Sequence, residues 1–195
     1  MKVKICGITT FEDALFAADC GADALGFVLY PPSKRFVPPH VVAEIVRSLP
    51  PFVLSVGVFA QESAYEVCAL AKQANVQLLQ LHNEALFDFS YPTRTLKVAR
   101  IASKDDVAAL NSADFVLCDT FCEGFGGAGL RTPLTFFDGI DCSRLILAGG
   151  LNPDNVVEVR GMGFYGVDVS SGIESSVGKK DHKKVQDFIK NAKTL

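Results

Sequence analysis

The sequence lacks the charge and hydropathy patterns that mark nucleic-acid-binding and membrane proteins. Lysine and arginine are scattered, the net charge is -3, and no basic stripe is visible, which argues against a nucleic-acid partner. No apolar run approaches the roughly 18 residues that are needed to span a bilayer. Residues 1–5 lack the apolar core and cleavage site of a secretory signal, so we expect a cytoplasmic protein without a membrane partner.

Cysteine pairs with metal-binding or redox spacing are also missing. The six cysteines, at positions 6, 20, 68, 118, 122 and 142, form no Cys-x-x-Cys pair and have no neighbouring histidine cluster. In a reducing compartment most of them should be small buried apolar residues. The spacing of Cys118 and Cys122 does not match the common zinc motifs, so we expect no metal site.

The chain shows no linker, low-complexity tract or composition shift. Hydrophobic residues make up 49% and charged residues 21%, as in ordinary globular proteins. The length is ample for one buried core and short for two domains, so we expect residues 1–195 to form one domain. The densest basic cluster, Lys179, Lys180, Lys183 and Lys184, is interpreted as the solvated face of a helix that begins nearby.

Short β-like apolar runs alternate with helix-length amphipathic segments along the chain. Several of the runs are continuously apolar, which is typical of parallel strands that are covered on both faces. The alternation implies an α/β fold with a parallel sheet, and eight units of about 24 residues favour a closed (β/α)8 TIM barrel over an open doubly wound sheet. The eight candidate strands are residues 3–6, 24–28, 53–59, 76–82, 95–99, 115–119, 145–148 and 166–169.

Helix boundaries are marked by capping residues. Thr9 and Glu12 match a capping box, Asn152 followed by proline predicts a helix that runs to about residue 160, and Asp181 can cap the last helix. Further helices are expected at 39–49, 63–74 and 103–110, with weaker signals at 84–89 and 133–140.

Glycine and serine follow the last two predicted strands, at the end of the barrel where function gathers. Gly149 and Gly150 follow the seventh strand, and Ser170, Ser171 and Gly172 follow the eighth. Glycine pairs let backbone amides approach an anion, and these two loops, helped by a helix amino terminus, are the usual phosphate site of such barrels. Because both loops carry the signature, we favour phosphate binding over a role in tight turns alone.

A second group of candidates could move protons and bind a carboxylate. Cys6 ends the first strand and Asp119 the sixth; singly they fit packing or capping, and together they form an acid/base pair in one barrel mouth. Arg35 lies in a proline-stiffened loop and suits bidentate carboxylate binding, although a loop arginine is more often a surface charge. His82 fits packing as well as catalysis.

The chain resembles the phosphoribosylanthranilate isomerases in many segments. These segments occur in the family's order and cover nearly the whole chain. They are KICGIT at 4–9, EDALFAADCGADALGFV at 12–28, PPSKRFVPP at 31–39, VGVF at 56–59, LLQLHNE at 78–84, LCDT at 117–120, LAGGLNPDNV at 147–156, VDVSSGIE at 167–174 and GKKD at 178–181.

The resemblance implies a cofactor-free isomerase of tryptophan biosynthesis, which turns N-(5-phosphoribosyl)anthranilate into 1-(2-carboxyphenylamino)-1-deoxyribulose 5-phosphate by an Amadori rearrangement. It implies that Asp119 is the general acid that opens the furanose ring and that Cys6, as a thiolate, removes the C2 proton. It implies that Arg35 binds the anthranilate carboxylate, and it places Asp168 and His82 near the ligand. The expected partner is a small phosphorylated molecule, and a monomer is the default, with a homodimer as the alternative.

One loop departs from the family pattern, and three alternatives stay open. Leu130 stands where a lysine is expected, with Arg131 beside it, and the family's tryptophan is absent. An indole-glycerol-phosphate synthase would be expected to use a lysine, and the histidine-pathway aminoaldose isomerase paired aspartates, instead of the pair Cys6 and Asp119. A binding protein without turnover is encouraged only by the altered loop at 123–135.

Overall fold

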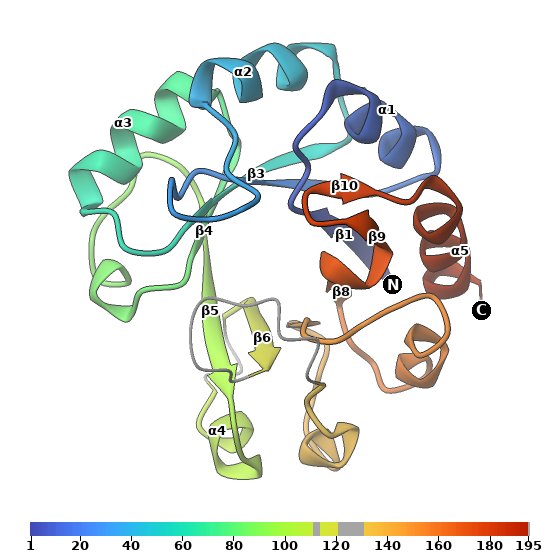
Figure 1. Ribbon diagram of the computed structural model, residues 1–195. Helices are drawn as coiled ribbons and strands as arrows, with labels where there is room; N and C mark the ends of the chain where they lie inside the picture. The colour runs from blue at the N-terminus through green and yellow to red at the C-terminus, as the bar shows by residue number, and fades with distance from the viewer. Residues whose placement is uncertain (111–113, 121–130, 195) are drawn as a thin grey trace.

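Eight parallel strands pair in sequence order and close into a barrel, with β8 returning to β1 (Figure 1). The computed structural model describes residues 1–110, 114–120 and 131–194. The predicted (β/α)8 TIM barrel is thereby confirmed. The strands are β1 (Lys2–Cys6), β2 (Ala24–Val28), β3 (Leu54–Phe59), β4 (Leu78–Leu81), β5 (Thr95–Ile101), β6 (Val116–Thr120), β7 (Leu145–Leu147) and β8 (Gly166–Val169).

All eight predicted strands occur, with ends that differ by at most two residues. Their apolar side chains are buried on both faces, between the strands and the outer helices and inside the barrel. Phe27, Phe59 and Phe188 are among the largest fully buried side chains of the outer layer. A smaller buried cluster is made of Leu96, Val98, Leu117 and Ala148, which come from β5, β6 and the residue after β7.

Helices surround the barrel, and the larger ones are where the sequence predicts them (Figure 1). Within the described ranges, no helix is long and apolar enough to cross a membrane. The α-helices are α1 (Phe11–Asp19), α2 (Pro39–Ser48), α3 (Ala64–Ala74), α4 (Lys104–Ala108) and α5 (His182–Lys193). The segments with weaker helical signals form single 3₁₀ turns, η1 (Glu84–Leu86) and η2 (Leu134–Phe137).

The predicted α-helix after β7 is wrong. The Asn152 side chain accepts hydrogen bonds from the amides of Asp154 and Asn155, both at 2.9 Å, as the predicted cap would. Only a short 3₁₀ helix, η3 (Val156–Val159), follows. The loop after β7 is therefore not followed by a regular α-helix whose amino terminus could face an anion.

The cap of α1 is one residue later than predicted. The Thr10 hydroxyl accepts a hydrogen bond from the Asp13 amide at 3.2 Å, whereas the Thr9 hydroxyl donates to the Gly178 carbonyl. Thr10 has the extended backbone that an N-cap requires, with φ of -128°. The predicted cap of α5 is confirmed, because Asp181 accepts from the Lys184 amide at 3.1 Å.

A short antiparallel hairpin between β8 and α5 was not predicted. After the 3₁₀ turn η4 (Ser171–Ile173), β9 (Glu174–Ser176) pairs with β10 (Lys179–Lys180). Lys180 is only 3% exposed, so the interpretation of its cluster as a solvated helix face is wrong at this residue. The strands are too short to give a periodic sequence signal. Cys122, which was considered as one half of a metal-binding pair, lies outside the described residues. Leu130, which stands at the position of the family lysine, also lies outside them.

Candidate active site

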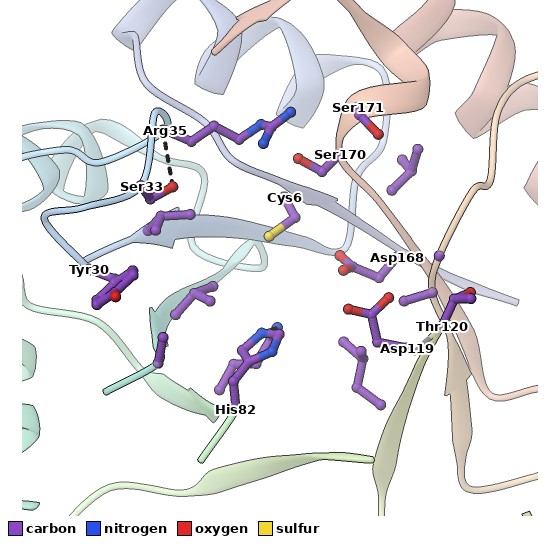
Figure 2. A pocket seen from close by; sticks show the side chains of 18 of the residues that line it. Cys6, Tyr30, Ser33, Arg35, His82, Asp119, Thr120, Asp168, Ser170 and Ser171 are labelled. Atoms are coloured by element: carbon purple, nitrogen blue, oxygen red, sulfur yellow. Dashed lines mark hydrogen bonds between the residues drawn. The ribbon is translucent and has the colours of Figure 1, made fainter. Parts of the chain in front are cut away.

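A cavity of about 560 Å³ lies at the carboxyl ends of the barrel strands (Figure 2). Strand ends and the loops after β2, β7 and β8 line it, so residues that are far apart in sequence meet there. Nine of the ten predicted site residues line this cavity: Cys6, Arg35, His82, Asp119, Gly149, Gly150, Asp168, Ser170 and Ser171.

The two glycine-containing loops differ in what their glycines do. Gly149 and Gly150 have φ of +84° and +61°, a left-handed backbone that favours glycine, and both line the cavity. A side chain at Gly149 would overlap the hydroxyl of Thr120. Gly172 is not among the residues that line the cavity, and a side chain there would overlap the Leu151 carbonyl. Its glycine is therefore explained by close packing of two backbones, and its part in phosphate binding stays a prediction.

Asp119 is a carboxyl group with a raised pKa. Burial raises the pKa to about 6, and the negative charge of Asp168 adds to this effect. The Thr120 amide and the positive charges of Lys4 and Arg100 oppose it. About a tenth of such a carboxyl group is protonated at pH 7, which suits a group that donates a proton and takes it back.

Cys6 lies beside a buried ion pair. Burial raises the pKa of the Cys6 thiol and Asp168 raises it further, whereas Lys4, by charge and by hydrogen bond, and Lys180 lower it. The Lys4 ammonium lies 2.7 Å from the Asp168 carboxylate. Burial also acts to lower the pKa of Lys4, but the charges of Asp168 and Cys6 outweigh it, so this pKa is raised and Lys4 stays charged.

His82 lies at the end of β4 and is uncharged at neutral pH. Burial lowers its pKa to about 4, and the positive charges of Lys4 and Arg100 act in the same direction. Its Nε2 lies 2.9 Å from the Gln80 amide nitrogen.

Arg35 lines the cavity, as predicted, and already holds a carboxylate of the protein. Its Nε and Nη2 donate to the two oxygens of Glu174 at 2.8 and 2.7 Å. The hydrogen bonds to Glu174 outweigh burial and raise the pKa of Arg35. The residue is therefore not a solvated surface charge, and a ligand carboxylate would meet a guanidinium with one edge occupied.

Three charged residues near the cavity were not predicted: Lys4, Glu174 and Lys180. Lys4 could have been found, because side chains two residues apart on a strand share a face and Cys6 was already placed at the barrel mouth. Glu174 and Lys180 lie on the short hairpin, for which the sequence pattern gave no prediction. Among the described residues, no group of three or more His, Cys, Asp or Glu side chains is placed to hold a metal ion.

The arrangement can bind an anion and move protons. Ser170, Ser171 and the Gly149–Gly150 backbone form one side of the cavity, and Cys6, Asp119 and Asp168 point into it from β1, β6 and β8 (Figure 2). A thiol, a carboxyl group of raised pKa and two loops whose backbone and hydroxyl groups could hold an anion together suit proton transfer on a phosphorylated carbon skeleton.

A family model and a sequence relative match nearly the whole chain. The sequence model of "N-(5'phosphoribosyl)anthranilate (PRA) isomerase" matches residues 3–191. An N-(5'-phosphoribosyl)anthranilate isomerase from Sulfurovum sp. (strain NBC37-1) is 49% identical, and the alignment covers 100% of both chains.

Two solved structures also resemble the chain over its whole length. A phosphoribosyl anthranilate isomerase in complex with reduced 1-(o-carboxyphenylamino)-1-deoxyribulose 5-phosphate superimposes with a TM-score of 0.82, at 38% identity and 100% coverage of both chains. A structure of monomers generated from the dimeric enzyme of Thermotoga maritima has a TM-score of 0.83, at 36% identity and the same coverage. With the strand-end thiol, the carboxyl group and the glycine and serine loops in one cavity, these matches show that the chain belongs to the N-(5'-phosphoribosyl)anthranilate isomerase family, the aldose–ketose isomerases of tryptophan biosynthesis.

Proposed function

We propose that Asp119 and Cys6 are the general acid and the general base of the Amadori rearrangement of N-(5-phosphoribosyl)anthranilate. The observation that carries the proposal is that both side chains line one cavity together with the Gly149–Gly150 and Ser170–Ser171 loops. A structural relative that is bound to a reduced form of the reaction product supports the same ligand class for this chain.

The rearrangement opens the furanose ring and then moves protons at two neighbouring carbons of the ribose, C2 and C1. Asp119 donates a proton to the furanose ring oxygen, the C1–O bond breaks, and the nitrogen lone pair forms an iminium. The Cys6 thiolate removes the proton from C2, and the electron pair moves through C1 onto nitrogen to give an enolamine. Protonation at C1 and loss of the C2 hydroxyl proton give the ketone. Oxidation at C2 is balanced by reduction at C1, so the step requires no external electron acceptor.

Thiolate formation is the demanding part of this mechanism. Because burial raises the pKa of Cys6, the thiolate depends on nearby positive charge. Lys4 supplies that charge from two residues earlier on β1, and Lys180 adds to it. The pair of groups then works in reverse protonation, with a minority of Asp119 protonated and a minority of Cys6 ionised at neutral pH.

The remaining cavity residues would bind and orient the substrate. The Gly149–Gly150 backbone with Ser170 and Ser171 is suited to the phosphate, and Arg35 to the anthranilate carboxylate. Asp168 and the neutral His82 lie beside the sugar in this arrangement. We further propose that residues 1–195 act as one cytoplasmic domain without cofactor, as a monomer or a homodimer.

The proposal is tested by the loss of anthranilate fluorescence when purified protein is mixed with freshly prepared phosphoribosylanthranilate in the presence of a chelator. Rapid loss that depends on the protein is expected, and much slower loss with the dephosphorylated substrate. No turnover by folded protein would contradict the isomerase, and strong inhibition by the chelator would contradict its independence of metal.

A further inference from the structure

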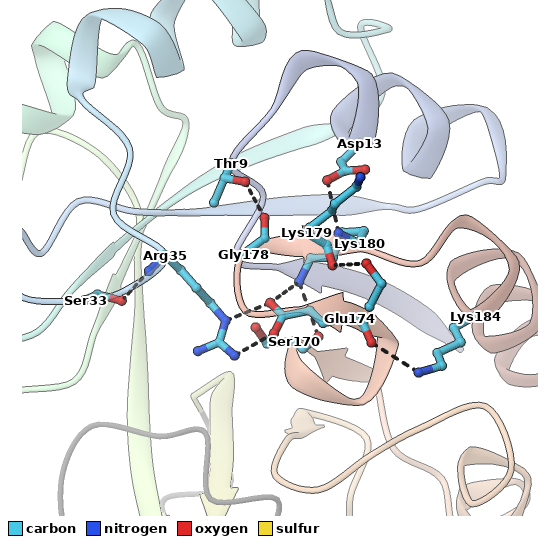
Figure 3. Close-up of polar contacts among 11 residues, drawn as sticks. Thr9, Asp13, Ser33, Arg35, Ser170, Glu174, Gly178, Lys179, Lys180 and Lys184 are labelled. Carbon is cyan, nitrogen blue, oxygen red and sulfur yellow. Dashed lines mark hydrogen bonds and ion pairs between the residues drawn. The ribbon is translucent and has the colours of Figure 1, made fainter.

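The β9–β10 hairpin places two charged side chains behind Arg35 (Figure 3). Glu174 accepts both hydrogen bonds from the guanidinium, and its Oε1 also accepts from the Lys180 ammonium at 3.1 Å. Lys180 donates in addition to the Ser170 carbonyl at 3.2 Å. The side chains of Lys180 and Glu174 are only 1% and 5% exposed, and that of Arg35 is 18% exposed. Arg35 is therefore the member of this triad that reaches the cavity.

The triad fixes the orientation of the guanidinium. The two hydrogen bonds to Glu174 use Nε and Nη2, and a guanidinium carries five N–H donors in a planar fork. The edge formed by Nη1 and Nη2 can therefore receive a second carboxylate. The stem of Arg35 passes over Gly7, where a side chain would come within 2.7 Å of Arg35 Cδ. One face of the stem is thus closed by backbone, and Glu174 holds the head.

The triad also sets the charge that a ligand meets. An arginine paired with a single glutamate is neutral as a unit and attracts an incoming carboxylate weakly. Lys180 adds a second positive charge, so the buried triad has two cations and one anion. The surplus positive charge is held where water screens it poorly, next to the one member that lines the cavity.

We propose that Glu174 and Lys180 are positioning residues that make Arg35 selective for the carboxylate of the ligand. The inference rests on the proposed carboxylate contact of Arg35. Glu174 fixes the guanidinium edge that faces the cavity, and Lys180 restores the net positive charge that Glu174 would otherwise cancel. Neither Glu174 nor Lys180 is among the residues that line the cavity, so their effect on a ligand carboxylate is transmitted by Arg35.

The hairpin is attached to its surroundings at points that do not involve the triad side chains. The Lys180 amide donates to Asp13 of α1 at 3.2 Å, and the Lys184 ammonium donates to the Glu174 carbonyl at 3.1 Å. Lys184 therefore contacts the backbone of the same glutamate without touching its carboxylate. The variant Lys184→Met is a matched control, since it removes one lysine and one hydrogen bond to Glu174 and leaves the triad intact.

The experiment compares two ligands by isothermal titration calorimetry. One is the reduced product analogue 1-(2-carboxyphenylamino)-1-deoxyribitol 5-phosphate, and the other is its phenyl analogue without the carboxylate. The wild-type protein, Lys180→Met, Glu174→Gln, Glu174→Asp and Lys184→Met are measured with both, after circular dichroism has shown that each is folded. We expect Lys180→Met and Glu174→Gln to weaken binding of the carboxylated ligand about tenfold and to leave the phenyl ligand unchanged. Glu174→Asp, which keeps the charge, should recover part of the loss.

Three results would overturn the inference. Equal weakening of both ligands by Lys180→Met would mean that Lys180 acts on the phosphate loop through Ser170. Tighter binding of the carboxylated ligand by Glu174→Gln would mean that Glu174 competes with the ligand. If folded Lys180→Met and Glu174→Gln kept the wild-type ratio of affinities for the two ligands, the triad would play no part in carboxylate selection. If the wild-type protein itself binds both ligands equally, the proposed carboxylate contact of Arg35 fails first, whatever the turnover assay gives.

Discussion

Lys4 and Asp168 are opposite each other in the register of β1 and β8, and their charged groups lie 2.7 Å apart inside the barrel. Their side chains are only 7% and 10% exposed. The two charges act in opposite directions on the reacting groups, because Asp168 raises the pKa of both Cys6 and Asp119 and Lys4 lowers both. One buried ion pair thus influences the pKa of both the proposed acid and the proposed base.

Removing the lysine should make the Cys6 thiol harder to ionise. In Lys4→Met, the positive charge beside Cys6 is lost and the negative charge of Asp168 remains, so the pKa of the thiol rises. We expect the rate of Cys6 alkylation by iodoacetamide at pH 8 to fall about tenfold, measured peptide by peptide with mass spectrometry. Alkylation of the partly exposed Cys20 and Cys68 serves as an internal control. An unchanged Cys6 rate would show that Lys4 does not support the thiolate.

The pH dependence of turnover should reveal two titrations that cancel. Above pH 6, each pH unit lowers protonated Asp119 about tenfold and raises the Cys6 thiolate about tenfold, so wild-type kcat/KM should be nearly flat from pH 7 to 9. In Asp119→Asn the acid is gone, and the residual kcat/KM should rise about tenfold per unit over the same range. A flat profile in the variant would contradict Cys6 as the base.

His82 should make the fold sensitive to acid. Its pKa is about 4 in the folded protein and about 6.5 when unfolded, so the unfolded chain binds the extra proton between these values. Stability therefore falls as pH falls through that window, by the order of 2 kcal/mol for this group. His82→Gln should lose less stability than the wild-type protein between pH 6.5 and 4.5 in urea unfolding.

Asp119 should have the opposite effect over part of the same window. Its pKa is about 6 when folded and near 4 when unfolded, so between these values the native state binds more protons and acid stabilises it. Asp119→Asn should consequently lose more stability on acidification than the wild-type protein does. If His82→Gln and Asp119→Asn shifted the acid limb in the same direction, one of the two burial assignments would be wrong.

Substitution of Gly149, compared with Gly163, tests whether the proposed phosphate loop tolerates a side chain. Gly149 and Gly163 both have positive φ, at +84° and +80°, but a side chain overlaps Thr120 only at Gly149 and meets nothing within 4 Å at Gly163. Gly163→Ala should cost about 1 kcal/mol from the backbone alone, and Gly149→Ala about 3 kcal/mol. Urea unfolding measures both. Inhibition by inorganic phosphate should weaken only in Gly149→Ala, and equal effects in the two variants would exclude a special role for this loop.

The barrel could be predicted because its signal repeats along the chain. Each strand is an apolar run of a few residues between helix-length segments, and eight such units leave few ways to cover both faces of a parallel sheet. The predictions failed in local detail. After β7 the Asn152 side chain accepts from two amides as a cap would, but only a 3₁₀ helix follows, and at α1 Thr10 took the cap that was assigned to Thr9.

The part of the site that lies at the ends of the barrel strands could be predicted from the sequence. Cys6, Asp119 and Asp168 meet because parallel strands of a barrel bring their carboxyl ends to one mouth. The hairpin is different: Glu174 and Lys180 become important only through contact with Arg35, which is 139 residues from Glu174 in the sequence. Such a contact depends on tertiary packing, which local patterns do not contain.

The most direct test of the acid/base assignment is the single-turnover rate of anthranilate fluorescence loss at pH 7.5 in Cys6→Ala and Asp119→Asn, with Cys142→Ala as the control for loss of a buried thiol. Binding of the reduced product analogue is measured in parallel to show that the cavity is intact. We expect rates at least about a hundredfold below wild type in both site variants, near-normal affinity for the analogue, and a near-normal rate in Cys142→Ala. A near-normal rate in either Cys6→Ala or Asp119→Asn would contradict the assignment.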